Sequence, residues 1–125
     1  MNKNRSVVLI AGLSSSRRLP LIAVLQRHGY ETLEAGDGFE ALQTAVVRDV
    51  DVLIAEDEMP GLTGRELIGV VRKHRAISHC LLISDTDQLS PGDTALVEGT
   101  TSFLVGPFEY ERLLGRIREA VPELI

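Results

Sequence analysis

Short apolar runs alternate along the chain with longer segments in which apolar residues recur every three or four positions. Runs of adjacent aliphatic residues bounded by polar turns predict strands buried on both faces, and a short alternating segment predicts an outer strand. In chain order, the predicted strands are Val7–Ala11, Glu31–Ala35, Val52–Ala55, Cys80–Ile83 and Thr101–Val105.

The first two helical segments carry recognisable start and stop signals. A proline is tolerated in a first turn but clashes further into a helix, so Pro20 predicts a helix that begins late, near Leu19, or that starts distorted. The helix is predicted to end at Gly29. Asp37, with Glu40 three residues later, predicts a capping box for the second helix. The side chains expected to face the core are those of Leu19, Ile22, Val24 and Leu25 in the first helix, and of Ala41, Leu42, Ala45 and Val46 in the second.

Three further helical segments complete the pattern. They are predicted from Gly64 to Lys73, over a short stretch at Asp93–Val97, and over Glu109–Val121. Five strands that alternate with five helices predict an α/β domain with one doubly wound parallel sheet.

Length and charge narrow the class of protein. The 125 residues fit a single domain, 1–125, and the net charge of −5 argues against binding of nucleic acid or anionic membrane by this domain. The N-terminus lacks a secretory signal and no apolar stretch could span a membrane, which together predict a cytoplasmic protein.

The single cysteine, Cys80, lies in an apolar run, which predicts a buried, inert thiol. The histidines show no metal-ligand spacing, so no metal centre is predicted.

An acidic cluster follows the third predicted strand. Glu56, Asp57 and Glu58 end the apolar run, and Met59-Pro60-Gly61 cannot continue it. Carboxylates at the carboxyl end of a buried parallel strand lie where ligands bind in open α/β sheets. The alternative interpretation is a solvated acidic loop without a specific role.

Four motifs resemble the receiver domain of bacterial two-component response regulators, the CheY-like family. They are Leu25–Tyr30, Ala35–Leu42, Met59–Gly64 and Phe103–Phe108. The resemblance covers essentially the whole chain. It implies a flavodoxin-like (βα)5 fold with strand order 2-1-3-4-5, and a site above strands one, three, four and five.

The family's chemistry is phosphoryl transfer from a phosphohistidine to an aspartate that follows strand three. A pair of acids after strand one holds Mg²⁺, a lysine before a proline contacts the phosphoryl oxygens, and a hydroxyl and an aromatic residue transmit the change. The resemblance assigns these roles to Glu56 in place of the aspartate, Gly12 and Leu13 in place of the acids, and Gly106 in place of the lysine. Only the hydroxyl, Ser84, and the aromatic, Phe103, match the family pattern.

These departures predict a pseudo-receiver that keeps the fold and signals by protein contacts, without phosphorylation, catalysis, cofactor or metal. One alternative is a working phosphorelay receiver with atypical chemistry at Glu56 or Asp57. Another is a flavin- or nucleotide-binding enzyme that uses the Gly12–Ser16 loop as a phosphate cradle. The shortage of aromatic residues and the absence of tryptophan argue against the enzyme.

Several positions have two interpretations. Glu56 is either a stand-in for phosphoaspartate or a solvated edge carboxylate. Arg17 or Arg18 is predicted to lie near the acidic cluster in place of the lost cations, the alternative being an exposed pair. Leu13 is expected to pack in the core, and the Gly106–Pro107 bond is predicted to be cis by family resemblance.

Ser84 and Phe103 also have two interpretations each. Ser84 is either a hydrogen-bonding switch or a local cap, and Phe103 is either a rotameric switch or a fixed core aromatic. The family resemblance places the output surface on the fourth helix, fifth strand and fifth helix. Its candidate contact residues are Leu96, Val97, Phe103, Tyr110, Arg112 and Arg116. The partner classes it implies are a histidine kinase, an effector domain or a second copy in a homodimer.

Overall fold

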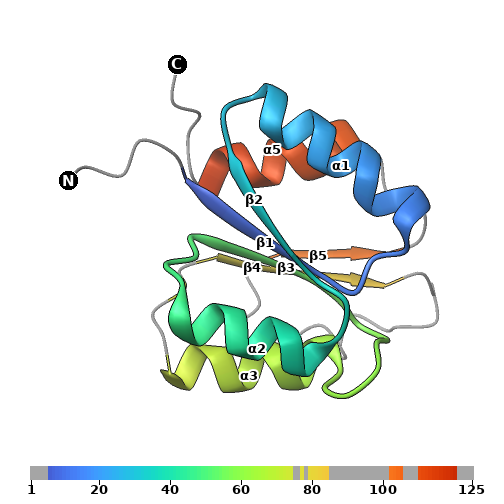
Figure 1. Ribbon diagram of the computed structural model, residues 1–125. Coiled ribbons are helices and arrows are strands. Elements are labelled where there is room, and N and C mark those ends of the chain that lie inside the picture. Colours follow the sequence, from blue (N-terminus) through green and yellow to red (C-terminus); the bar gives the residue numbers. More distant parts are fainter. Residues whose placement is uncertain (1–5, 75–76, 78, 85–101, 106–109, 121–125) are drawn as a thin grey trace.

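The protein is a three-layered α/β domain, and in the described part of the chain one parallel sheet lies between two pairs of helices (Figure 1). The computed structural model describes residues 6–74, 77, 79–84, 102–105 and 110–120. The strands are β1 (Val7–Ala11), β2 (Glu31–Ala35), β3 (Val52–Glu56), β4 (His79–Ser84) and β5 (Ser102–Val105). The helices are α1 (Ser15–Arg27), α2 (Gly38–Val47), α3 (Gly64–His74) and α5 (Tyr110–Ala120).

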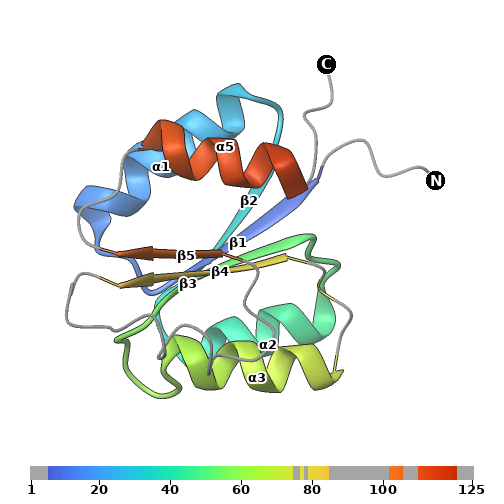
Figure 2. The same ribbon diagram turned by 180° about the vertical axis from the view of Figure 1, so that it is seen from behind.

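The sheet has the strand order β2-β1-β3-β4-β5, and each neighbouring pair is parallel. Helices α1 and α5 cover one face, and α2 and α3 cover the other, as the two opposite views show (Figures 1 and 2). The predicted doubly wound sheet and its strand order are therefore confirmed. The predicted helix at Asp93–Val97 and the Gly106–Pro107 bond lie outside the described residues.

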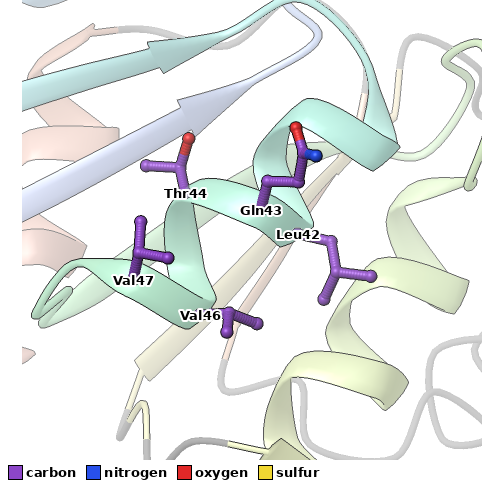
Figure 3. A pocket seen from close by; sticks show the side chains of 5 residues that line it. All are labelled: Leu42, Gln43, Thr44, Val46 and Val47. Carbon is purple, nitrogen blue, oxygen red and sulfur yellow. The ribbon is translucent and has the colours of Figure 1, made fainter.

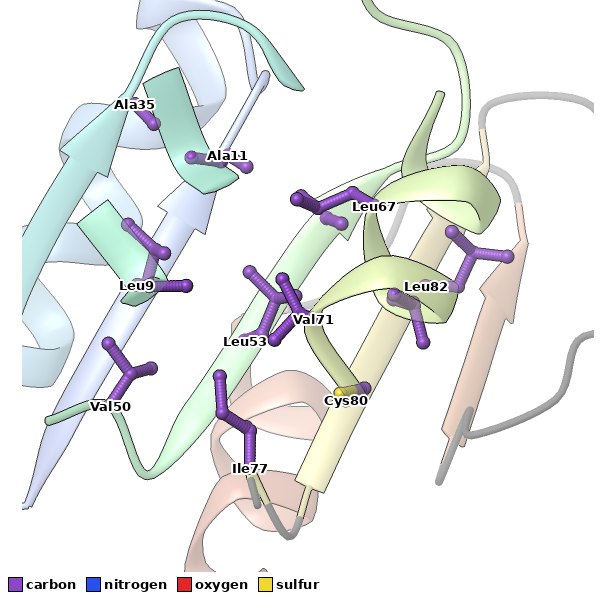
Figure 4. Close-up of a cluster of buried hydrophobic side chains, with 14 of the residues drawn as sticks. Leu9, Ala11, Ala35, Val50, Leu53, Leu67, Val71, Ile77, Cys80 and Leu82 are labelled. Carbon is purple, nitrogen blue, oxygen red and sulfur yellow. The ribbon is translucent and has the colours of Figure 1, made fainter. Parts of the chain in front are cut away.

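Alternation along the buried strands divides the core in two. Leu9 and Ala11 of β1 face α2 and α3, where they pack in one cluster with Leu67, Val71 and Leu82 (Figure 4). The intervening residues of β1 belong to a second cluster beneath α1 and α5. This second cluster includes Val8, Ile10, Leu21, Leu25, Leu113 and Ile117. Both faces of the strand are buried, which explains why its sequence is continuously apolar.

The predicted late start of the first helix is wrong. Helix α1 begins at Ser15 and contains Pro20. The backbone N–H groups of Arg17 and Arg18 donate to the Ser14 carbonyl at 3.0 and 2.8 Å, which closes the first turn before the proline is reached. The carbonyl that Pro20 leaves without a helical donor is that of Ser16, an exposed residue, so water can bond to it.

The core-facing set of the helices also differs from the prediction. Leu21 and Leu25 are the buried residues of α1, whereas Leu19 is 58% exposed. In α2, Val46 is 47% exposed because the helix packs on the sheet through Ala41 and Ala45. The helical period does not by itself fix which side of α1 faces inward, and packing on the sheet selects the side with Leu21 and Leu25.

Side-chain caps begin α2 and α3. Asp37 accepts a 2.8 Å hydrogen bond from the Glu40 N–H, which confirms the predicted cap of α2. The Glu40 carboxylate accepts from the Gly36 N–H rather than from the cap residue itself. A second capping box, not predicted, joins Thr63 and Glu66 at the start of α3 through two reciprocal hydrogen bonds of 3.0 and 3.2 Å.

Cys80 is buried in β4, as predicted. Burial raises the pKa of the Cys80 thiol to about 11, an effect that the positive charge of Arg72 partly offsets. The reactive thiolate is therefore a minor species at neutral pH.

Candidate functional site

The candidate site lies where β1 and β3 end side by side. Glu56 is the last residue of β3 and is only 7% exposed. The interpretation of Glu56 as a solvated edge carboxylate is therefore wrong. A carboxylate this well covered requires polar or positive neighbours to remain charged.

The loop after β1 passes very close to Glu56. Gly12 has φ +88°, a conformation that favours glycine, and its N–H donates to the Ala35 carbonyl at 3.0 Å. A Cβ at position 12 would lie 2.8 Å from the Met59 sulfur and 3.2 Å from the Glu56 Cβ. The space beside Glu56 is thus occupied by a methionine side chain and a bare glycine backbone.

Leu13 does not face Glu56. It is buried in the cluster beneath α1 that also contains Leu21 and Leu25, which confirms that it packs in the core. No residue from 11 to 13 carries a carboxylate, so this part of the β1 edge offers no acidic metal ligand whichever of these positions faces the site.

Arg17, in the first turn of α1, is the nearer of the two candidate arginines to the acidic cluster. Its Nη1 lies 4.0 Å from the Glu56 Oε2, and both side chains are largely covered. Arg18 turns away to pair with Glu34 at 2.9 Å, and its Nη1 donates to the Leu13 carbonyl at 3.1 Å. The predicted proximity to the acidic cluster is confirmed for Arg17, while Arg18 pairs with Glu34 of β2.

Asp57 has a different arginine. The Nε of Arg65 in α3 donates to its carboxylate at 3.0 Å, in a pair that is partly buried. The Asp57 backbone is also fixed, because its N–H donates to the Ile83 carbonyl at 2.7 Å and its carbonyl accepts from the Gly64 N–H at 3.0 Å. Sequence reasoning missed Arg65; the signal was an arginine directly after the glycine that opens α3.

The two carboxylates thus lie near two guanidinium groups that come from helices on opposite faces of the sheet. Within the described residues, no three acidic, histidine or cysteine side chains come together as a candidate metal site. The structure describes the backbone of Ser84 and Phe103 but not their side chains. Gly106 and Pro107 lie outside the described residues.

Arg17→Ala is expected to lower the free energy of unfolding by no more than about 1 kcal/mol. The pair is 4.0 Å apart, beyond hydrogen-bond distance, and ion pairs that are not fully buried contribute about 0–1 kcal/mol. Urea unfolding at low and high salt measures the change. Arg48→Ala is the matched control, since it breaks the more exposed pair with Glu31, formed at 3.0 Å. A loss of about 3 kcal/mol for Arg17→Ala alone would show instead that Glu56 depends on it as the partner of a buried charge.

A parallel sheet of this order, with helices on both faces and acidic residues at the carboxyl end of a central strand, has the flavodoxin-like doubly wound fold. Residues 8–118 match the response regulator receiver domain family. The chain therefore belongs to this family of signalling domains from two-component systems.

Individual relatives show the same relationship. The chain is 33% identical to the chemotaxis response regulator CheY4 of Vibrio cholerae, with a TM-score of 0.81, and the match covers 94% of this chain and 99% of that one. The transcriptional regulatory protein PdtaR of Mycobacterium tuberculosis is 31% identical over 91% of this chain and 56% of its own length.

The CAI-1 autoinducer sensor kinase/phosphatase CqsS of Vibrio cholerae is 28% identical over 88% of this chain, which spans only 16% of that protein. The chain thus corresponds to a part of these curated relatives. No helix among the described residues is both long and apolar enough to cross a membrane.

Proposed function

We propose that this receiver domain signals through protein contacts without being phosphorylated. The observation that carries the proposal is Glu56, a buried carboxylate near Arg17, a cation of the chain's own, at 4.0 Å. In this interpretation Glu56 occupies the place of the phosphoacceptor, and Asp57 is the alternative acceptor.

The lost positions explain why phosphoryl transfer is not expected. Mg²⁺ is held by carboxylate oxygens at 2.0–2.1 Å, and Gly12 and Leu13 supply none. Without the metal, and with Gly106 in place of a lysine, the phosphoryl oxygens lose both of the cations that the family's reaction uses. The extra methylene of Glu56 also displaces its carboxylate by about 1 Å, an error that can cost about a hundredfold in rate.

Asp57 is a poor substitute acceptor. Its carboxylate is engaged by Arg65 at 3.0 Å. Attack on a phosphoryl group would require this pair to open, and adjacent strand residues direct their side chains to opposite faces.

The signalling output then depends on the equilibrium between the conformations of the domain itself. When no ligand binds one of two conformations more tightly than the other, their populations are set by the sequence alone. Ser84 and Phe103 are the switch-equivalent residues in this proposal, and the surface of the fourth helix, β5 and α5 contacts the partner. Among the described residues of that surface, Arg116 of α5 is exposed.

The proposed partners follow the relatives. CqsS is named as a sensor kinase/phosphatase and PdtaR as a transcriptional regulatory protein. For this chain we propose a kinase or an effector domain as the partner, with a homodimer as a further form. We also propose that the domain works in the cytoplasm and has no enzyme activity of its own.

The test is the intact mass after incubation with acetyl phosphate and Mg²⁺. We expect no gain of a phosphoryl group, while a receiver that retains the aspartate, acid pair and lysine gains one under the same conditions. A gain in this protein would overturn the proposal. In that event, Glu56→Gln and Asp57→Asn would show which carboxylate accepts the group, because the gain would disappear in one variant only.

A further inference from the structure

Helix α2 carries three of its large apolar side chains on the outside, while Leu42 is half-buried and packs against the core. The residues it buries against the sheet are small, namely Gly38, Ala41 and Ala45. Its exposed apolar residues are Phe39 at 58%, Val46 at 47% and Val47 at 73% exposure. Surface helices normally direct their large apolar residues toward the core, so this arrangement leaves an apolar stripe facing solvent.

A depression runs along this exposed side of α2. It has a volume of about 490 Å³ and is lined by Leu42, Gln43, Thr44, Val46 and Val47, which we call the α2 groove (Figure 3). Phe39 lies one turn before the groove. A Cβ on Gly61 would lie 2.7 Å from its ring, so the ring rests directly against that glycine of the β3–α3 loop.

The charged residues of α2 and of the turns that flank it are mainly acidic. Asp37 and Glu40 lie at the start of α2, and the exposed Asp49 follows its end. The basic residue at that end, Arg48, is paired with Glu31 at 3.0 Å. A second copy of this chain would bring the same acidic rim, and the chain as a whole has a net charge of −5.

We propose that the α2 groove docks an amphipathic helix of a partner protein whose apolar face is flanked by lysine or arginine. Phe39, Leu42 and Val46 are spaced by three and four residues, the spacing that packs against another helix. The ten residues of α2 extend over about 15 Å, which accommodates roughly three turns of a partner. The backbone of α2 is bonded within the helix, so it offers no edge to an added strand. This inference does not depend on the phosphorylation state of the domain.

The experiment uses the whole chain and three synthetic peptides of about 18 residues, long enough to form a helix on binding. One has leucines at helical spacing with lysines on the flanks. The second replaces the lysines by glutamates, and the third has the lysine composition in scrambled order. Backbone amide chemical shifts are followed by NMR at low and at physiological salt.

We expect the lysine peptide to shift the amides of α2, to bind more weakly as salt rises, and to bind better than either control peptide. Val46→Gln with Val47→Gln should weaken binding at least about tenfold without changing charge or helix propensity much. Glu40→Gln should weaken it about two- to threefold. Leu19→Gln, an equally exposed apolar residue on α1, should leave binding unchanged.

Three results would overturn the inference. The first is equal binding of the glutamate or scrambled peptide. The second is a set of shifted amides outside α2 that the Val46 and Val47 variants do not affect. The third is concentration-dependent dimerisation of the protein alone with the same α2 amides shifted, which would make a second copy the occupant. None of these outcomes bears on the mass test for phosphorylation.

Discussion

Gly64→Ala is expected to destabilise the domain by about 3 kcal/mol, because the added methyl group would collide with backbone that cannot move aside. A Cβ at position 64 would overlap the Glu56 carbonyl oxygen and lie 2.7 Å from the Leu82 Cδ1. The same glycine donates its N–H to the Asp57 carbonyl at 3.0 Å. Relief would require α3 to move away from the end of β3.

Gly69→Ala in the same helix is the matched control. Nothing lies within 4 Å of a Cβ at position 69, and alanine is better than glycine inside a helix by about 0.5–1 kcal/mol. This variant should therefore stabilise the domain while Gly64→Ala destabilises it. Urea unfolding followed by circular dichroism measures both. Equal and small changes in the two variants would mean that α3 adjusts freely, and the close packing of α3 on the site would be refuted.

The close packing of α3 on β3 also shapes the acidic cluster. Gly64 allows the first turn of α3 to approach β3 closely enough for Arg65 to reach Asp57 at 3.0 Å. Arg17 approaches Glu56 from the opposite layer at 4.0 Å. The acidic cluster thus contacts a helix on each face of the sheet. A change at the cluster would alter contacts in both helical layers.

The fold could be predicted because its strongest signals are local. The aliphatic runs of β1 and β3 are buried on both faces, so their sequences are continuous and easily recognised. The beginning of α1 could not be predicted in the same way. A proline in the second turn lowers the expectation of a helix, and only the structure shows that the affected carbonyl belongs to an exposed residue, Ser16.

The site was predicted in part. Arg17 follows from its place after the first loop. The glycine before Arg65 is a local signal, but the contact of Arg65 with Asp57 depends on how closely α3 packs on β3, which is a tertiary feature. The exposure of Val46 has a similar origin, because α2 packs on the sheet through Ala41 and Ala45 of the predicted stripe and leaves Val46 at its edge. Helical spacing shows that a stripe exists, but not which of its residues faces the core most directly.

The second large effect is expected at Gly12. Gly12→Ala should cost about 2 kcal/mol, from a non-glycine residue at φ +88° and from contact with Met59. Gly36→Ala is the matched control, since Gly36 follows β2 as Gly12 follows β1. Its φ is not positive, and the nearest atom to an added Cβ is the Glu40 Oε2 at 3.6 Å. That variant should change the free energy of unfolding by less than about 0.5 kcal/mol.

The same geometry predicts that Gly12→Asp will not restore a Mg²⁺ site. An aspartate there must adopt the strained conformation, and its Cβ would lie 2.8 Å from the Met59 sulfur and 3.2 Å from the Glu56 Cβ. We expect a loss of stability of about 2–3 kcal/mol and no stabilisation by millimolar Mg²⁺ in thermal unfolding. Combining it with Met59→Ala should recover part of the loss by removing the closest contact. An unstrained Gly12→Asp variant that Mg²⁺ stabilises would show that the loop reopens readily and that the missing acid alone closed the site.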